Sequence, residues 1–188
     1  HKPKEKERIF LFIDLKSSTT IAERLGNFGF GSLLQDYYFD VSLAAGETNG
    51  EIYDYIGDEV IISWPLRNPQ NIKQCIDCIK KIKQIISSKE SDYSEKHGVV
   101  PRFKAGAHSG KVVVMWVGDH KKEIMYVGDV LNTAKRIQSE CDRLSADFLI
   151  SGESLRRFPG VGRDQFIVAG SPLLKGKSEP VELFMMDI

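Results

Sequence analysis

The chain has 188 residues, enough for one sizeable domain and too few for two of ordinary size. Its 26 Lys and Arg residues balance its 26 Asp and Glu residues, so we expect no nucleic-acid partner held by bulk charge. A hydrophobic fraction of 41% indicates a folded domain, and no apolar run approaches the ~20 residues of a membrane helix, so we expect no membrane contact from this segment.

The first elements follow from apolar runs and a capping signal. Residues 1–8 are charged and are expected to be a solvated lead-in to one domain over residues 9–188. The apolar run 9–14 predicts a buried strand. Thr20 and Glu23 have capping-box spacing, which predicts a helix from there to about residue 45, interrupted at the Gly-rich stretch 27–31.

A hairpin and a second helix come next. Residues 51–64 are rich in Ile, Val and Tyr, with Gly57-Asp58 at the expected bend. Residues 68–89 have helical periodicity and contain Cys75 and Cys78. A CxxC can bind metal or act in redox chemistry, but no second ligand pair is spaced for zinc, and the helical pattern favours two buried apolar thiols. Three cysteines in all favour a reducing compartment, and we expect a cytoplasmic domain.

The C-terminal half alternates short strands and helices. We predict strands at 103–117, 123–127 and 148–151, the first two joined by the charged turn 119–122, helices at 129–141 and 153–157, and a strand-like tail at 165–187. The elements lack the regular βαβ rhythm of a doubly wound sheet, so the sequence predicts an α+β sandwich.

Two carboxylates and the turn after the first of them could carry chemistry. Asp14 ends the first strand and Asp58 lies at the hairpin bend, where they could share two divalent cations, although Asp is also common in turns. The polar turn from Lys16 to Thr20 leads into a helix, whose free N–H groups could bind a phosphate or could simply be capped.

Other polar residues have weaker signals. Asn132 and Arg136 lie four apart on one helix face, where an amide and a guanidinium suit a negatively charged substrate oxygen or form a surface pair. Lys175-Gly176-Lys177-Ser178 is not a P-loop, because Ser171 stands where a Gly is needed and Pro180 follows. His108 is expected to be structural.

In combination, these motifs resemble the catalytic domain of class III nucleotidyl cyclases of bacterial type. The similar segments are IFLFIDLKSST, GEIYDYIGDEVIISW, YVGDVLNTAKRI and LLKGKSEPVELF, in the family's order. The resemblance extends from about Arg8 to Asp187 and implies a ferredoxin-like or palm-like α+β sandwich with an antiparallel central sheet.

The resemblance implies a role for each matching residue. Asp14, Asp58 and the backbone carbonyl of Leu15 would bind two divalent cations, Mg²⁺ or Mn²⁺. Asn132 would orient the ribose, and Arg136 would stabilise charge on the α-phosphate. Phosphate contacts would come from the turn Lys16, Ser17, Ser18 and Thr19, and from Lys175, with Lys177 as the alternative.

Base recognition departs from the family pattern. The two positions that usually read the purine hold Asp54 and Met125. Met offers no useful hydrogen bond, whereas Asp54 could accept from the N1–H and N2–H groups of guanine. The family resemblance, rather than these two residues, favours a purine nucleotide cyclase that converts ATP to 3′,5′-cyclic AMP and pyrophosphate, and Asp54 argues mildly for GTP. A guanylate cyclase and a non-catalytic nucleotide-binding or dimerisation domain are the alternatives, and a diguanylate cyclase is a more distant one.

The resemblance also implies a homodimer. The aspartates of each site would come from one protomer, and the Asn, Arg and Lys from the other, giving two composite sites. The chain begins with His1, so we expect an upstream sensor or membrane module in the full-length protein.

Overall fold

The computed structural model describes residues 2–120, 122–157 and 163–188. In chain order the elements are β1 (Lys4–Leu15), α1 (Ser18–Glu47), β2 (Glu51–Ile56), β3 (Glu59–Pro65), α2 (Gln70–Ser88), α3 (Glu90–His97), β4 (Phe103–Val117), β5 (Glu123–Val127), α4 (Asp129–Ser139), α5 (Cys141–Leu144), β6 (Phe148–Ser151), α6 (Gly152–Arg156), a 3-10 turn (Arg163–Gln165), β7 (Ile167–Gly170) and β8 (Leu183–Met185). None of the helices in these ranges has both the length and the apolar character that a membrane crossing demands.

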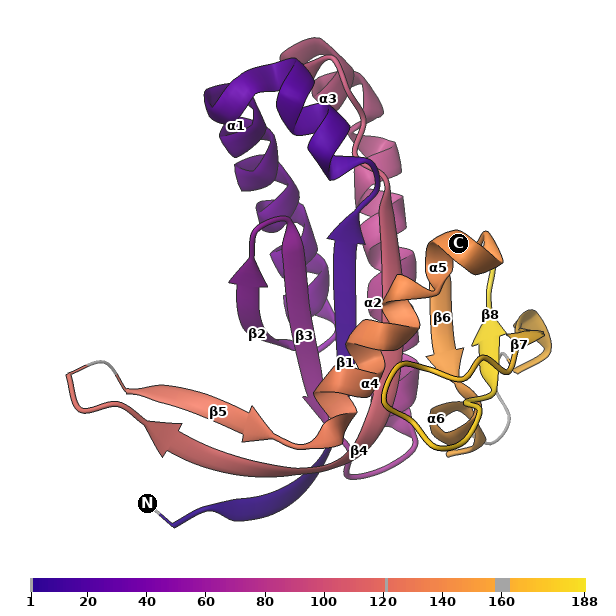
Figure 1. Cartoon of the computed structure of the whole chain (residues 1–188). Coiled ribbons are helices and arrows are strands. Elements are labelled where there is room, and N and C mark those ends of the chain that lie inside the picture. Colours follow the sequence, from indigo (N-terminus) through magenta and orange to yellow (C-terminus); the bar gives the residue numbers. More distant parts are fainter. Residues whose placement is uncertain (1, 121, 158–162) are drawn as a thin grey trace.

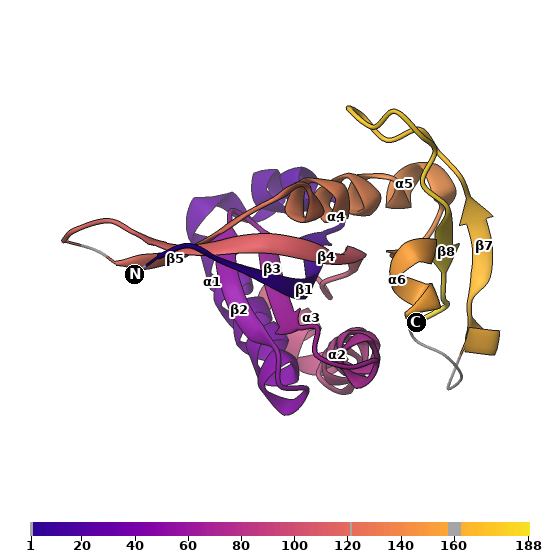
Figure 2. The ribbon, with the colours of Figure 1, turned by 90° about the horizontal axis from the view of Figure 1, so that it is seen from below.

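One sheet runs through the molecule, in the strand order β2-β3-β1-β4-β6-β8-β7, and β5 pairs with the outer part of β4. Neighbouring strands are antiparallel except β4 and β6, which are parallel. Helices α1 and α2 cover one face and α4 covers the other (Figures 1 and 2). The predicted α+β sandwich with a largely antiparallel central sheet is confirmed.

Strand β1 lies between β3 and β4 and feeds both hydrophobic layers, because alternate side chains point to opposite faces. The layer under α1 and α2 receives Ile9, Leu11, Ile13 and Leu15. The layer under α4 receives Phe10 and Phe12.

The first strand begins earlier than predicted. The expected lead-in is strand from Lys4 onward, because β4 is long enough to pair with it, with Val114 opposite Lys4. Arg8 is buried at 4% exposure and donates to Glu51 at 2.6 Å and to Ser63 at 2.7 Å. The charged residues of this segment therefore include one that forms an ion pair within the sheet, in addition to those that face solvent.

Helix α1 begins at Ser18, two residues before the predicted cap at Thr20, and Ser17 precedes it in the left-handed conformation with φ 57°. Gly26 interrupts the helix, with φ 67° and ψ 172°. The break lies one residue before the Gly-rich stretch 27–31, in which the interruption was predicted. Gly tolerates this positive φ because it has no Cβ.

The predicted hairpin and second helix are confirmed as β2–β3 and α2. Cys75 and Cys78 are buried on the inner face of α2 and form no disulfide. Burial raises the pKa of Cys78 to about 12, which favours an unreactive packing role. Helix α3 was not predicted: it is short and polar, and it is held to α1 by ion pairs and hydrogen bonds, among them Tyr93 donating to Asp40 at 2.8 Å.

The C-terminal elements largely match the prediction. Strands β4 and β5 form a hairpin that projects from the body of the molecule (Figure 1), and residue 121 of the predicted turn lies outside the described residues. The predicted helix 129–141 is divided into α4 and α5. The tail forms two short strands, β7 and β8, and the segment 171–182 between them is not strand, so the prediction of a continuously strand-like tail was wrong.

Helix α4 packs directly on the backbone of β4 at Gly106. A Cβ atom at this position would lie 2.3 Å from the backbone nitrogen of Gln138 and 2.6 Å from its Cα. Backbone atoms cannot rotate away as a flexible side chain can. The position of α4 therefore depends on the absence of a side chain at residue 106.

Gly106→Ala is expected to lower the free energy of unfolding by about 1–3 kcal/mol, the usual cost of overpacking. Urea unfolding followed by circular dichroism measures the change. Gly31→Ala in α1 is the matched control, since its added Cβ meets nothing within 4 Å and should stabilise the helix slightly. Equal stability of Gly106→Ala and the wild type would contradict the close contact.

His108 belongs to a buried polar cluster between β4 and β6. Its Nδ1 lies 2.7 Å from the hydroxyl of Ser151, which in turn donates to Ser154 at 2.8 Å. Burial lowers the pKa of His108 to about 4, so the ring is neutral at pH 7. A neutral, hydrogen-bonded ring fits the structural role expected for it.

This pKa makes stability depend on pH. Since the folded pKa lies below the unfolded value of about 6.5, the unfolded chain takes up the proton first as pH falls, and about 1–2 kcal/mol of stability should be lost by about pH 5. Urea unfolding near pH 7.5 and near pH 5 measures this loss, which should be smaller for His108→Asn. An equal loss in both proteins would contradict the assignment.

Candidate functional site

Asp14 and Asp58 lie side by side at one end of the sheet. The antiparallel register places Ile13 of β1 opposite Val60 of β3, so the next residue on β1 reaches the β2–β3 turn that carries Asp58. The two carboxyl groups are within hydrogen-bonding reach. Leu15, with 2% exposure, ends the same strand. The structure thus brings the predicted metal-ligating residues to one place.

Both carboxyl groups are partly withdrawn from water. Burial, followed by the hydrogen bond and the charge of Asp58, raises the pKa of Asp14 to about 7. Among the described residues, the Oδ2 atom of Asp58 and the hydroxyl of Tyr37 are buried without a hydrogen-bond partner. Burial and the charges of Asp14 and Asp58 raise the pKa of Tyr37 well above its usual value. An unpartnered carboxylate oxygen of Asp58, with the carboxylate of Asp14 next to it, suits a hard divalent cation.

The protein supplies few ligands of its own at this place. In the described ranges, no group of three or more His, Cys, Asp or Glu side chains is arranged as a metal centre. A cation on Asp14 and Asp58 would therefore need further oxygen atoms from the backbone, from water or from a bound substrate. Mg²⁺ is commonly held in that way, by one or two carboxylates plus substrate phosphates.

Several residues that sequence reasoning missed surround this pair. Tyr38 of α1 donates its hydroxyl proton to the carbonyl of Gly57 and holds the turn of Asp58. Glu59 forms a very short ion pair with Lys135 of α4, whose Nζ also lies 3.9 Å from the Oδ2 of Asp14. In the sequence Tyr38 has the pattern of a core aromatic and Lys135 that of a solvated helix residue, so no local signal marks either.

The turn after Asp14 keeps some of its backbone N–H groups free. Ser18 and Thr19 are in the first turn of α1, where backbone N–H groups lack helical partners, and Ile21 is the first to bond, to the Ser17 carbonyl at 3.0 Å. Lys16 differs from the prediction, because its amide donates to the Arg102 carbonyl at 2.8 Å.

The side chain of Lys16 is also occupied. It forms a short ion pair with Asp147, which lies just before β6. Free amides in the predicted phosphate-binding turn are therefore those of Ser17, Ser18 and Thr19, since no partner is recorded for them among the described residues.

Asn132 and Arg136 lie one turn apart on α4. Asn132 is exposed, and Arg136 packs on Gly176, where an added Cβ would lie 3.3 Å from both terminal guanidinium nitrogens. The guanidinium thus lies beside the loop that contains Lys175 and Lys177. The structure brings Arg136 to the loop that carries the two predicted lysines.

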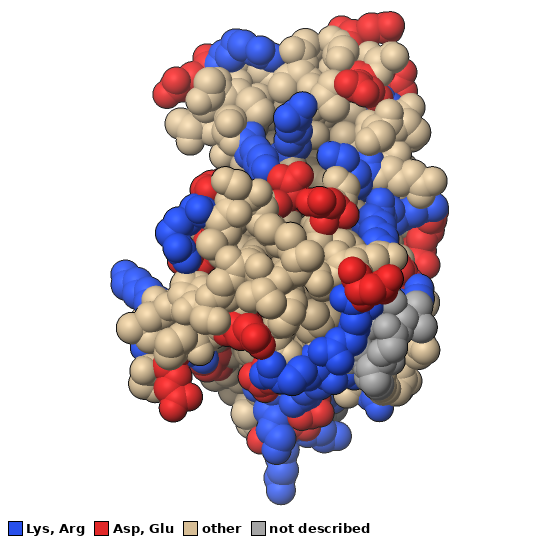
Figure 3. Space-filling model, turned by 90° about the vertical axis from the view of Figure 1, so that its right-hand side faces the viewer, with Lys and Arg blue, Asp and Glu red and all other residues tan. Residues whose placement is uncertain are grey.

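The two lysines of this loop differ in their surroundings. Lys177 forms a short ion pair with Asp129, whose pKa it lowers, whereas Lys175 is exposed and has no recorded partner among the described residues. Lys175 is therefore the lysine available to an anionic ligand. On the side of the molecule where α6, β7 and β8 lie, Lys and Arg side chains gather in a band, with Asp and Glu side chains directly beside it (Figure 3).

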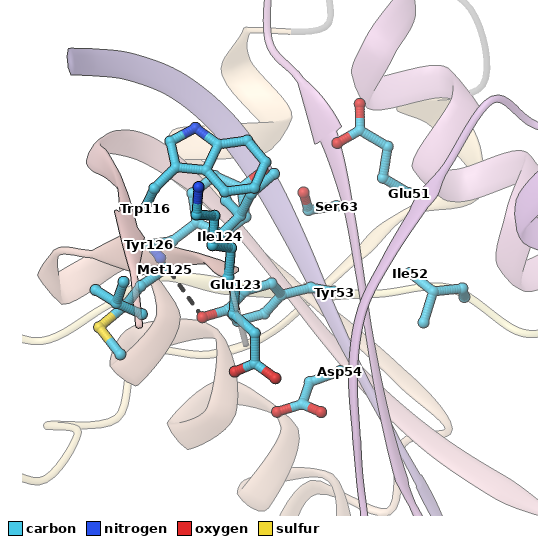
Figure 4. Close-up of a pocket in the computed structure, with 12 residues that line it drawn as sticks. Glu51, Ile52, Tyr53, Asp54, Ser63, Trp116, Glu123, Ile124, Met125 and Tyr126 are labelled. Atoms are coloured by element: carbon cyan, nitrogen blue, oxygen red, sulfur yellow. Dashed lines mark hydrogen bonds between the residues drawn. The ribbon is translucent and has the colours of Figure 1, made fainter. Parts of the chain in front are cut away.

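Asp54 and Met125 line one cavity of about 500 Å³ between β2 and the β4–β5 hairpin. In Figure 4 the carboxylates of Asp54 and Glu123 point to the same side of the cavity, whereas the side chain of Met125 points away. Asp54 also accepts a hydrogen bond from the amide of Tyr55 at 2.8 Å. The two predicted base-reading residues therefore share a cavity without facing each other.

Comparison with known proteins places this geometry in a family. The model of the adenylate and guanylate cyclase catalytic domain matches residues 2–184. Adenylate cyclase 2 of Rhizobium meliloti (strain 1021) is 36% identical over 156 residues, 83% of this chain and 43% of that protein. Adenylate cyclase 1 of the same organism is 23% identical over 180 residues, 93% of this chain and 26% of that protein. The chain thus spans less than half the length of either.

Solved structures share the fold. The adenylyl cyclase CyaB from P. aeruginosa superposes with a TM-score of 0.85 at 18% identity, covering 100% of this chain and 97% of that one. The guanylyl cyclase Cya2 also gives 0.85, at 17% identity, covering 99% and 94%. A family model that matches almost every residue, together with a relative that shares over a third of the aligned sequence, shows that this chain belongs to the adenylate and guanylate cyclase catalytic domain family.

Proposed function

We propose that the chain cyclises a purine nucleoside triphosphate, ATP in preference to GTP, to the 3′,5′-cyclic nucleotide and pyrophosphate. The observation that carries the proposal is the pairing of Asp14 with Asp58, where a buried Asp58 oxygen has no partner among the described residues. The preference for ATP is supported by the 36% identity to a protein named adenylate cyclase. The Asp54 carboxylate in the cavity keeps GTP as the second candidate.

In this proposal two divalent cations, Mg²⁺ or Mn²⁺, are held by Asp14, Asp58 and the Leu15 carbonyl. When bound, they supply positive charge that neutralises the triphosphate and acidifies the ribose hydroxyl. The proposed ligands are all oxygen atoms, which both ions prefer. The amides of Ser17, Ser18 and Thr19 bind terminal phosphate oxygens at the start of α1.

The remaining residues act on the reacting atoms. The ribose O3′ attacks the α-phosphorus, a new O3′–P bond forms, and the bond from that phosphorus to the bridging oxygen breaks to release pyrophosphate. Asn132 holds the ribose in line, and Arg136 stabilises the negative charge that grows on the α-phosphate oxygens. Lys175 holds the departing phosphates.

The proposed active form is a homodimer with two composite sites. Within one chain, Lys135 occupies the side of α4 that faces Asp14, while Arg136 faces the loop around Gly176. The Asn132–Arg136 face is then available to the aspartates of a second protomer. Exposed apolar side chains that could be covered in a dimer lie on the β4–β5 hairpin, at the end of β2 and between β7 and β8: Trp116, Ile124, Met125 and Val127, then Tyr55 and Ile56, then Leu173.

The proposal extends to the location and the domain organisation of the full-length protein. A cytoplasmic location is supported by the unpaired buried cysteines, which fit a reducing compartment. An additional module in the full-length protein is supported by relatives of which this chain spans less than half.

The purified dimer should form cyclic AMP from ATP with Mn²⁺ or Mg²⁺, and product identification by mass spectrometry with both ATP and GTP tests the substrate. Asn132→Ala and Arg136→Ala should each lower kcat by about 100-fold or more, because each removes stabilisation made in the transition state, with KM changing less. Lys111→Ala, on an exposed ion pair with Glu5, is the control. No cyclic product from either nucleotide in a verified dimer would overturn the proposal.

Complementation tests the composite sites. Asp14→Asn and Arg136→Ala should each be inactive alone, because every site of either homodimer lacks one half. After mixing and exchange of protomers, about one quarter of wild-type activity should return, since half of the dimers are mixed and each contains one intact site. A mixture that stays inactive while native mass spectrometry shows mixed dimers would contradict sites shared between protomers.

A further inference from the structure

Lys135 occupies an unusual place on α4. Its neighbour Arg136 packs on the loop at Gly176, whereas its own ammonium group reaches back to Glu59 on β3. Lys135 forms an ion pair with Glu59, whose side chain is 10% exposed. The same ammonium lies 3.9 Å from Asp14 Oδ2.

Three carboxylates and one ammonium thus share this corner. Asp14 and Asp58 are adjacent, and the charges of both Lys135 and Glu59 act on Asp14, in opposite senses. Lys135 satisfies Glu59, which would otherwise be a largely buried anion without a cation beside it. It also places a positive charge next to the oxygen atoms that a divalent cation would use. The Lys135 side chain is 42% exposed and that of Asp14 is 23% exposed, so water screens this charge only in part.

We propose that the Lys135–Glu59 pair sets the divalent-cation affinity of the Asp14–Asp58 site, with Lys135 as a resident counter-charge that a cation must oppose. This inference rests on the proposed function, because it takes Asp14 and Asp58 to be the cation ligands. Lys135 is a positioning residue here: it holds Glu59 away from the ligand set and competes for Asp14. Glu59 keeps the ammonium from moving fully onto Asp14.

The pair predicts effects of opposite sign. Without the ammonium, a cation meets a more negative site, so Lys135→Met should bind it more tightly. Without the Glu59 charge, the ammonium is free to settle on Asp14, so Glu59→Gln should bind the cation more weakly. The double variant removes both charges and should return close to the wild type. Lys135→Arg keeps the charge and should also stay close.

The experiment titrates Mn²⁺ into the purified domain without nucleotide and follows free Mn²⁺ by electron paramagnetic resonance. Lys135→Met should lower the dissociation constant by about fivefold or more, and Glu59→Gln should raise it by a similar factor. Lys111→Met is the matched control, because it removes the same charge from an exposed ion pair with Glu5. Circular dichroism and urea unfolding confirm that each variant is folded.

The outcomes separate this inference from the proposed function. A wild type that binds no Mn²⁺ at millimolar concentration would overturn this inference, whereas the proposed function is overturned by the absence of cyclic product, because nucleotide phosphates can complete the ligand set. A wild type that binds Mn²⁺, together with a Lys135→Met variant of unchanged or weaker affinity, would overturn this inference alone. An equal tightening in Lys111→Met would overturn it too, since net charge rather than the contact would then be the cause.

Discussion

Like charges held together out of water repel each other, and the register of β1 against β3 holds Asp14 and Asp58 together in spite of this. The hydrophobic layers on both faces of β1 fix that register, since a slip of one residue would exchange the two sets of buried side chains. Burial of the sheet thus holds the carboxylates in an arrangement that isolated side chains would avoid. A bound cation would relieve the repulsion that the fold imposes.

Helix α4 is the second element that the site depends on. It rests on bare backbone at Gly106, so its distance from the sheet is fixed by main-chain contact rather than by adaptable side chains. From that position it sends Lys135 toward the carboxylates and Arg136 toward the loop at Gly176. The loop is held in turn by the ion pair of Lys177 with Asp129. One short helix therefore sets the positions of two charged side chains, one beside the carboxylates and one beside the loop.

Local signals predicted the elements whose residues show a clear period or a strong turn. The hairpin at Gly57-Asp58 and the strand at 103–117 are where the pattern placed them. Helix α3 escaped prediction because its polar sequence has no apolar stripe, and tertiary ion pairs with α1 hold it in place. The lead-in at residues 4–8 escaped because pairing with the far end of β4 is a long-range contact.

The candidate site divides in the same way. Asp14, Asp58, Asn132 and Arg136 could be found because each stands at a strand end, a bend or a helix spacing that suggests chemistry. Lys135 and Tyr37 could not, since their interest lies in what they meet after folding. The amide of Lys16 looked available in a polar turn, yet a carbonyl from the segment before β4 uses it.

The adjacency of Lys135 and Arg136 has a consequence for the proposed dimer. One residue would serve the carboxylates of its own protomer, and the next would serve the substrate bound by the other. A small rotation of α4 that releases Lys135 in one site would displace the guanidinium in the second. Occupancy of the two sites would then be thermodynamically linked, and the linkage would be reciprocal, so the dimer would respond to substrate as a cooperative unit rather than as two independent catalysts.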